Sequence, residues 1–201
     1  MRLLTILIIL VTCGYAAMRG REVVGFAVAE EQTRSDAADS FLRWRDVPGI
    51  SGAAINAALS RMPFETSSAD AERRADTLGM LLAVRPLSSS DWLSLAGVRV
   101  ALDAPRDKVI SALTMSYLSG PNEDIMLQRG IFGLLQWEML TDADRQRIIH
   151  DLAGAITANA IPDLGTIKLI LDQKSAEARS NIQAMLGAER VPPADLTRIG
   201  L

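Results

Sequence analysis

The sequence predicts an all-α protein, and three observations support this prediction. Apolar residues make up 49% of the 201 residues but aromatic residues only 4%, and the apolar set is dominated by Ala and Leu, which form helices readily. No stretch alternates apolar and polar residues as a half-buried strand does. Several stretches instead repeat apolar residues with the spacing of one helix face, each after a polar residue that can cap a helix.

The N-terminal stretch, residues 1–21, is predicted to be a membrane-anchor helix or an uncleaved signal. Its residues 3–18 are apolar or neutral and lie between Arg2 on one side and Arg19 and Arg21 on the other. As a helix this run rises about 24 Å, slightly less than the ~30 Å hydrocarbon core of a bilayer. The flanking arginines can reach the headgroups and make up the difference, so residues 3–18 are the predicted membrane contact.

Two other interpretations of this stretch remain open. A signal peptide cleaved after Ala16 or Ala29 is the main alternative, and Cys13, which follows the letters LVT, gives a likeness to a lipoprotein signal. Positive residues on both sides of the apolar run leave the positive-inside rule without a clear direction. A very short N-terminal flank is usually retained inside, which would export the rest of the chain.

The remainder of the chain is predicted to form one helical domain with a linker before it and a tail after it. Residues 22–34 are the expected juxtamembrane linker, 35–187 the α-helical domain, and 188–201 an extended tail stiffened by two prolines. No low-complexity linker interrupts the domain, which is why one domain is expected. The helices expected inside it lie near 35–46, 51–62, 67–85, 89–102, 104–119, 123–140, 141–157, 163–172 and 175–187.

Polar residues at the starts of these helices predict where they begin. Ser67 with Asp70, and Thr141 with Asp144, have the spacing of a capping box, in which two side chains satisfy the first free N–H groups of a helix. Asp103 is the expected cap of the helix over 104–119. The next helix, capped by Asn122 and apolar nearly all round, is expected at the centre of the domain.

Residues 92–134 carry small and apolar residues at fixed spacings. The run reads Leu93-x2-Ala96-Gly97-x2-Val100, then Val109-x3-Leu113, then Pro121, and Leu127-x2-Gly130 repeats its start 34 residues later. This stretch resembles a degenerate tetratricopeptide repeat and the beginning of another, although Trp92 stands one residue early for the pattern. The resemblance implies stacked helical hairpins with Gly97 where two helices approach closely. A plain helical bundle is the alternative, and both are all-α.

The repeat register, if it holds, predicts where a partner binds. In stacked helical repeats the first helix of each hairpin lines a groove. The candidate groove residues are Asp91, Ser94, Gln128, Phe132 and Gln136. The expected occupant is a protein partner in the membrane or envelope.

Composition and motifs argue against several other functions. The net charge of −3 argues against a nucleic-acid binder, which would present a basic face. One His and one Cys remove most zinc sites and Ser-His-Asp triads, and no Gly-rich phosphate loop or nucleophile motif occurs. We therefore predict a non-enzyme with no catalytic residue, metal or cofactor.

Two features that resemble functional groups are assigned structural roles instead. His150 and Asp151 lie between apolar residues of a predicted helix, and adjacent helical residues do not face each other, so they form no ready dyad. His150 is expected to be a partly buried structural histidine. Trp44, Trp92 and Trp137 are expected to be core aromatics.

The phrases RPLSSSDWLSLAG and SGPNEDIMLQRG, following an N-terminal anchor, resemble small bacterial envelope proteins associated with surface-polysaccharide assembly. This resemblance implies a single-pass protein of the bacterial inner membrane with a periplasmic helical domain. The predicted function is a non-catalytic, membrane-anchored helical-repeat adaptor that binds a protein partner. The alternative is an exported soluble glycan-binding domain, using Arg43 and Arg45, or an enzyme released after signal cleavage.

Overall fold

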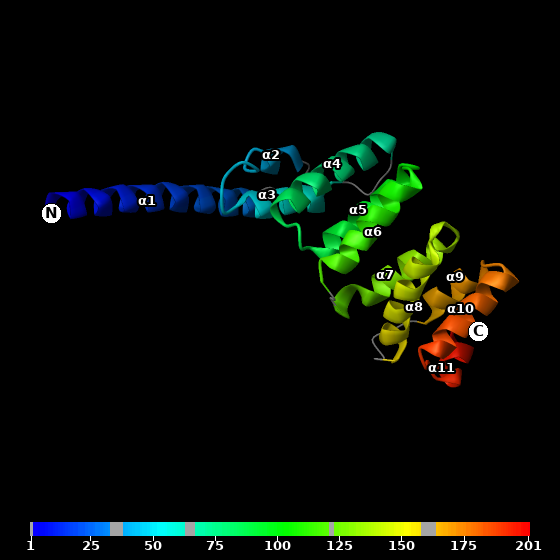
Figure 1. Cartoon of the computed structure of the whole chain (residues 1–201). Coiled ribbons are helices and arrows are strands. Elements are labelled where there is room, and N and C mark those ends of the chain that lie inside the picture. The colour runs from blue at the N-terminus through cyan, green and yellow to red at the C-terminus, as the bar shows by residue number, and fades with distance from the viewer. Residues whose placement is uncertain (1, 33–37, 63–66, 121–122, 158–163) are drawn as a thin grey trace. The chain divides into compact units, whose positions relative to one another are not determined.

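The structure is a computed structural model that describes residues 2–32, 38–62, 67–120, 123–157 and 164–201. Within these ranges the chain forms helices and no β-strand, which confirms the all-α prediction (Figure 1). The internal contacts divide the chain into two units, Met1–Pro86 and Leu87–Leu201. The division falls inside the region 35–187, which was predicted as one domain.

The first unit contains a long N-terminal helix and three further helices. Helix α2 packs against α3, and α3 against α4. The ring of Phe26 on α1 lies 5.9 Å from that of Phe41 and 6.1 Å from that of Trp44, in edge-to-face geometry, which aromatic pairs prefer. These helices are α1 (Arg2–Gln32), α2 (Ala38–Leu42), α3 (Ser51–Arg61) and α4 (Ser68–Val84).

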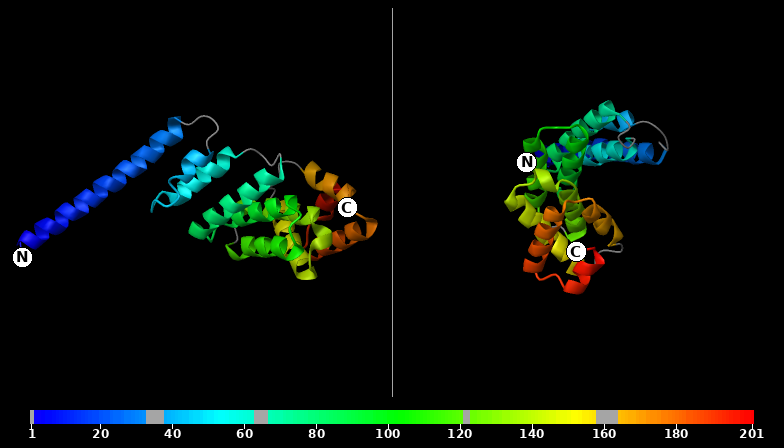
Figure 2. Two further views of the ribbon diagram at one scale, coloured as in Figure 1. Left: turned by 90° about the horizontal axis from the view of Figure 1, so that it is seen from above. Right: turned by 90° about the vertical axis from the view of Figure 1, so that its right-hand side faces the viewer.

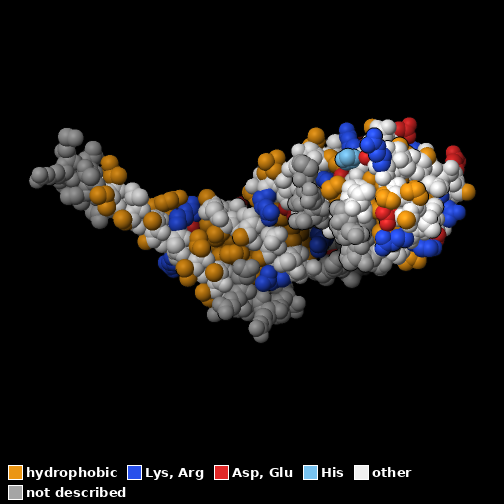
Figure 3. All heavy atoms as spheres, turned by 90° about the horizontal axis from the view of Figure 1, so that it is seen from below, with side chains coloured by type: hydrophobic (Ala, Val, Ile, Leu, Met, Phe, Trp, Pro, Cys, Tyr) orange, Lys and Arg blue, Asp and Glu red, His pale blue; other side chains and the backbone are white. Residues whose placement is uncertain are grey.

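Helix α1 runs without a break through the predicted anchor and the predicted linker. Residues 22–32 are therefore helical and not a separate connecting segment. Side chains at residues 11–18 are exposed, and apolar side chains are visible along this helix at the left of Figure 3. In the described part of the chain, no helix is both long and apolar enough to cross a membrane.

The helix expected over 35–46 is shorter than predicted. Its described part, α2, ends at Leu42, and hydrogen-bonded turns then lead to Ile50. Pro48 and Gly49, which is left-handed with a φ of +91°, lie in these turns. Because proline donates no backbone hydrogen bond, the chain restarts its helix only at Ser51.

The second unit is built from two consecutive helical hairpins followed by three further helices (Figures 1 and 2). Helix α5 packs against α6, and α7 packs against α8. Helices α5 and α7 have equal lengths of 13 residues, and their first residues, Ser89 and Glu123, are 34 positions apart. The elements are α5 (Ser89–Ala101), α6 (Arg106–Leu118), α7 (Glu123–Leu135), the 3₁₀ turn η1 (Trp137–Met139), α8 (Asp142–Thr157), α9 (Gly165–Asp172), α10 (Ala176–Ala188) and α11 (Pro193–Arg198).

The α5–α6 hairpin is held together at the end where α5 begins and α6 ends. Ser116 donates a hydrogen bond of 2.8 Å from Oγ to the carbonyl of Ser89. Ser89 in turn donates from its own Oγ to the carbonyl of Gly120, at 3.1 Å. Gly120 has a φ of +134°, as expected for a glycine that ends a helix.

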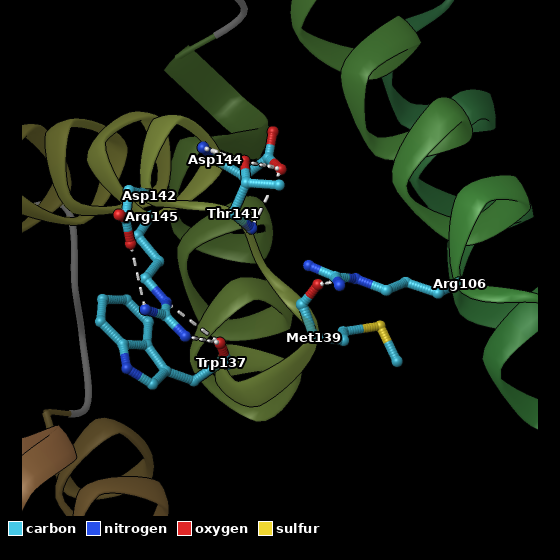
Figure 4. A network of polar contacts seen from close by, with 7 residues as sticks. All are labelled: Arg106, Trp137, Met139, Thr141, Asp142, Asp144 and Arg145. Atoms are coloured by element: carbon cyan, nitrogen blue, oxygen red, sulfur yellow. Dashed lines mark hydrogen bonds and ion pairs between the residues drawn. The ribbon is translucent and has the colours of Figure 1, made fainter.

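The helix predicted over 123–140 ends earlier, at Leu135, and is followed by η1. The break is stabilised by arginines that bind the freed carbonyls (Figure 4). Arg145 donates to the carbonyl of Trp137 from Nε and Nη2, at 3.3 and 3.2 Å, and its guanidinium lies 5.2 Å from the indole centroid. Arg106 donates to the carbonyl of Met139. Backbone carbonyls at the end of a helix have no N–H donor within the helix, so they need partners of this kind.

The side-chain caps at Ser67 and Thr141 are present, and the cap at Asp103 is not. The reciprocal bond that completes a capping box is found at Thr141, whose amide donates to Asp144 Oδ2 at 3.3 Å. Ser67 Oγ accepts from the amide of Asp70 at 3.2 Å, and Thr141 Oγ1 accepts from the amide of Asp144 at 3.2 Å. Asp103 was expected to cap the following helix. It lies instead in a left-handed turn with a φ of +48°, and α6 begins after Pro105. The predicted cap at Asn122 falls outside the described residues.

The C-terminal residues 188–201 are not extended as predicted. Residues Pro193–Arg198 form helix α11, and Val191, Leu196 and Ile199 are buried. Proline is well tolerated at the first position of a helix, where its missing N–H would have had no partner. Pro193 therefore begins a helix that packs against α10.

Close packing of α7 on α8 depends on glycines, but Gly97 is not one of them. A Cβ at Gly133 would lie within 2.6 Å of Ile148 Cγ2, and one at Gly130 would lie 3.2 Å from Leu152 Cδ1. A Cβ at Gly97 would meet no atom within 4 Å. The prediction of a close approach at Gly97 is therefore wrong, because the neighbouring Ala96 is the small residue that is buried.

We expect Gly133→Ala to destabilise the protein and Gly97→Ala to stabilise it. The added methyl at 133 would displace buried Ile148, and such overpacking costs about 1–3 kcal/mol. Alanine favours a helix by up to about 1 kcal/mol over glycine. At position 97 no clash opposes this gain, because the added methyl group would meet no atom within 4 Å. Urea denaturation of both variants measures the difference. Equal free energies of unfolding for the two variants would contradict the close approach of α7 and α8 at Gly133.

Lys174, which follows α9, ties that helix to the η1 turn. Its Nζ lies 3.0 Å from Glu138 Oε2 and 3.3 Å from the carbonyl of Leu135. The hydrogen bond from the Lys174 ammonium lowers the pKa of Glu138 below its ordinary value. This pair contributes stability above the ordinary glutamate pKa, and the contribution is lost as the pH falls through the lowered value.

We expect Lys174→Gln to raise the pKa of Glu138 towards the ordinary glutamate value of about 4.3. An NMR titration of the Glu138 side-chain carboxyl carbon measures this change. Lys168→Gln is the matched control, because Lys168 pairs with Asp172 at 2.9 Å. A Glu138 titration that is the same in both variants would contradict the assignment.

Candidate ligand-binding cavity

An open cavity of about 540 Å³ lies in the second unit, among α6, α7, α8 and the residue that follows α10. Most of its lining comes from one face of α8. Polar side chains dominate it, in contrast to the apolar interior of the helical hairpins. The lining residues are Tyr117, Arg129, Ala143, Gln146, Arg147, His150, Asp151 and Glu189.

The inner part of this cavity is formed by a buried ion pair. Arg129 Nε lies 2.6 Å from Asp151 Oδ2, and the two side chains are only 2% and 7% exposed. Arg129 also donates from Nη1 to the carbonyl of Ser116 at 3.1 Å. Its guanidinium lies 4.6 Å from the ring centroid of Tyr117. Each charge thus has the partners that a buried charge requires.

Burial changes the protonation behaviour of two groups in the cavity. Burial raises the pKa of Asp151, and this effect exceeds the lowering by the Arg129 guanidinium. Burial and the nearby Asp151 carboxylate raise the pKa of Tyr117. The phenol therefore stays protonated. Its Oη is buried.

The rim of the cavity carries exposed charged side chains. Arg147 is 49% exposed and reaches Asp144 Oδ1 from Nη1 at 3.4 Å. His150 is 72% exposed, and its Nδ1 lies 3.1 Å from Oε2 of Glu189. In Figure 3 the pale-blue histidine side chain is visible at the surface with Lys or Arg side chains nearby. The His150–Glu189 contact joins α8 to the end of α10.

A smaller cavity of about 320 Å³ adjoins the first and shares Gln146 and Glu189 with it. Its remaining lining is apolar and comes from Ile149, Met185 and Ala188. We call the two cavities together the α8–α10 groove. The lining of the groove mixes polar side chains, such as Arg147 and Tyr117, with apolar ones, such as Met185.

The chemistry of the α8–α10 groove favours binding through hydrogen bonds and charge. The residues that line the larger cavity include no Ser, Thr, Cys or Lys to act as a nucleophile. Among the described residues, no group of three or more His, Cys, Asp or Glu side chains is placed to hold a metal ion.

The five predicted groove residues line neither cavity. Asp91 and Ser94 lie on α5, Gln128 and Phe132 on α7, and Gln136 just after α7. Ser94 and Gln128 are exposed and 34 positions apart, whereas the other three are partly buried. Oδ2 of Asp91 is buried without a hydrogen-bond partner among the described residues.

The structure separates His150 from Asp151, as expected for adjacent helical residues. Asp151 points inward to Arg129, and His150 points outward. The prediction of a partly buried His150 is wrong, because the helix face that carries it is exposed.

The sequence analysis missed Arg129. The available signal was a lone arginine inside a helix that was predicted to be central, since such a charge needs a buried partner.

The tryptophans of both units have structural contacts. Trp137 is buried, and Trp44 packs its ring edge within 3.2 Å of a Cβ position at Gly25. Both agree with their predicted roles, and Trp92 is partly buried. Arg43 lies with its guanidinium 5.3 Å from the Trp44 ring.

No family model matches the chain, and no curated protein and no solved structure matches it. The resemblances to tetratricopeptide repeats and to envelope proteins therefore remain predictions from the sequence.

We expect Arg129→Met to destabilise the protein strongly and Arg147→Met to have little effect. Loss of Arg129 leaves Asp151 buried without a partner, which costs about 3–5 kcal/mol, whereas a half-exposed pair such as that of Arg147 contributes about 1 kcal/mol or less. Denaturant titrations of the two variants measure the contrast.

The loss in Arg129→Met should also depend on pH. Without the cation, the pKa of buried Asp151 rises further, so the folded state binds a proton more tightly than the unfolded state. The variant should therefore recover stability relative to the wild type as the pH is lowered from 7 to about 5. A stability difference that does not change over this range would argue against a buried, unpaired carboxylate.

Proposed function

We propose that the chain is a non-catalytic binding protein whose α8–α10 groove holds a segment of a protein partner. The observation that carries this proposal is the convergence of buried and rim polar groups on an open cavity that a second, smaller cavity adjoins. Sites of this kind, with a few convergent polar groups and groups of perturbed pKa, are where ligands usually bind.

The shape of the α8–α10 groove supports a peptide segment as the occupant. Its two adjoining cavities of about 540 and 320 Å³ share Gln146 and Glu189, and neighbouring side chains of one peptide can occupy two such cavities. The stacked hairpins α5–α6 and α7–α8 provide a rigid support, as helical repeats do in many adaptors. Adaptor function was predicted from the sequence, and the proposal keeps it while moving the binding site.

The groove predicted along α5 and α7 is the competing location. Ser94 and Gln128 occupy equivalent positions of the two first helices and are both exposed. A partner bound there would contact Gln128 and not Gln146. A partner in the α8–α10 groove would contact Gln146 and not Gln128.

A photocrosslinking amino acid placed at one of three glutamines tests the proposal. Gln146 lines both cavities of the α8–α10 groove, Gln128 belongs to the competing groove, and exposed Gln183 on α10 lines neither cavity. The full chain is produced in its native host, illuminated, and its adducts are identified by mass spectrometry. We expect one defined protein adduct at Gln146 and none at Gln183.

The three positions make the outcomes distinct. An adduct at Gln128 alone would move the binding site to the first helices and overturn the proposed groove. The same proteins captured at all three positions, or none captured at any, would overturn the proposal that the α8–α10 groove binds a partner.

A further inference from the structure

Helix α1 exposes apolar side chains on more than one face between residues 8 and 18. Ile8, Val11 and Tyr15 share one face, at spacings of three and four residues, and are 57%, 63% and 56% exposed. Ile9 and Cys13 lie on another face and are exposed as well. The sequence has no charged residue from position 3 to position 18. This part of α1 therefore has no charged face to turn towards water.

The polar group of Thr12 is satisfied within the helix. Its Oγ1 donates to the carbonyl of Ile8 at 2.8 Å. A hydroxyl that bonds to the backbone of its own helix needs no water, so Thr12 does not give this stretch a hydrated side.

The first unit holds α1 near the C-terminal end of the helix. Phe26 is buried against the rings of Phe41 and Trp44, and a Cβ at Gly25 would lie 3.2 Å from Trp44 Cη2. Met18 lies eight residues before Phe26, which is about 12 Å along the helix axis, and is 55% exposed. The exposed apolar stretch thus precedes the part of α1 that packs on the unit.

An aromatic and positively charged turn follows this stretch. Arg19 donates from Nε to the hydroxyl of Tyr15 at 3.0 Å, and its guanidinium lies 5.2 Å from the centroid of that ring. Glu22 pairs with Arg19 at 2.8 Å. Arg21 is exposed and leaves this turn with a net positive charge. Tyrosine and arginine at the end of an apolar helix are typical of the level of lipid headgroups, and the positive charge complements anionic lipids.

The distribution of apolar side chains favours lipid over a second copy of the chain. A second helix covers one stripe of its partner, as in a coiled coil, and would leave the other exposed faces of α1 in water. Hydrocarbon covers all faces at once, and a helix that is apolar all round is stable only where it is surrounded in this way.

We infer that residues 8–18 of α1 insert into the hydrocarbon of an anionic lipid bilayer, with Arg19 and Arg21 among the headgroups. The stretch from Ile8 to Met18 rises about 15 Å, about half of the ~30 Å hydrocarbon core, so insertion does not require α1 to cross the bilayer. This inference is independent of the α8–α10 groove, which lies in the second unit.

Flotation of the full chain with vesicles tests the insertion. The vesicles contain equal parts of phosphatidylcholine and phosphatidylglycerol, and the chain is diluted onto them from a mild detergent. Val11→Asp should lower the affinity for vesicles about 100-fold, because a charged side chain is costly in hydrocarbon. Leu169→Asp is the matched control, because Leu169 on α9 is 66% exposed, close to the 63% of Val11. It should float like the wild type.

A fluorophore on Cys13, the single cysteine of the sequence, reports which part of the chain meets the lipid. A nitrobenzoxadiazole group attached there should shift to shorter wavelength on addition of vesicles. Lipids that carry a nitroxide on the acyl chain should quench it. The variant Cys13→Ser/Ser94→Cys moves the fluorophore to an exposed position on α5, where no quenching is expected.

Removal of one charge tests the placement of Arg21. Arg21→Gln should lower the affinity for the mixed vesicles about fivefold, as an arginine near an anionic surface allows. The affinity for vesicles of phosphatidylcholine alone should stay the same. Arg198→Gln is the control, because Arg198 is 60% exposed and belongs to α11. It should change neither affinity.

The alternative outcomes are distinct. No flotation of the wild type, or equal flotation of Val11→Asp, would overturn the inference. Flotation without quenching at Cys13 would place the lipid contact elsewhere and overturn it as well. A short-wavelength signal at Cys13 without vesicles, in a chain that sediments as a dimer, would show that a second copy covers α1. Equal losses in Arg21→Gln and Arg198→Gln would overturn the placement of Arg21 among the headgroups.

Discussion

The buried pair of Arg129 and Asp151 joins the helices of the second unit. From this pair a line of hydrogen bonds runs through four helices. Asp151 on α8 holds Arg129 on α7, Arg129 binds the carbonyl of Ser116 on α6, and Ser116 binds the carbonyl of Ser89 at the start of α5. Ser89 closes the line on the carbonyl of Gly120. Both hairpins are therefore tied to one polar network inside an otherwise apolar core.

Such a network restricts the fold more than it stabilises it. Removing two charges from water costs several kcal/mol per ion, and their attraction repays this only when the geometry satisfies both groups. Apolar packing alone would tolerate sliding of α7 along α8, but a register shift would leave Arg129 or Asp151 buried and unpaired. We propose that the pair fixes the register of α7 between its neighbours. The pair also forms the inner part of the cavity, so the element that fixes the fold also positions the candidate site.

Local features of the fold could be predicted from the sequence, and long-range features could not. The side-chain caps at Ser67 and Thr141 depend on residues three positions apart, and both are present. The partner of Arg129 lies 22 positions away on another helix. No periodicity within one helix indicates such a partner. The break after Leu135 likewise depends on Arg106, which binds the η1 turn from 33 positions away.

The candidate site was missed for a related physical reason. The tetratricopeptide pattern directs attention to the first helix of each hairpin, whereas the cavity is formed mainly by α8, a second helix, and by Glu189 at the end of α10. Helix α8 does not meet another long hairpin. It packs against α10 instead, and the adjoining cavities lie at this junction.

The position of Glu189 follows from the way in which α10 ends. Arg190 adopts a left-handed conformation with a φ of +64°, which costs a non-glycine residue about 1–2 kcal/mol. Val191 then donates to the carbonyl of Leu186 at 3.1 Å and is buried, as in a Schellman motif. This turn leaves Glu189 beside His150 instead of continuing the helix. A glycine would form the same turn at lower cost. The wall of the cavity is therefore held by the burial of Val191 and of Leu196 on α11, and not by the intrinsic preference of Arg190.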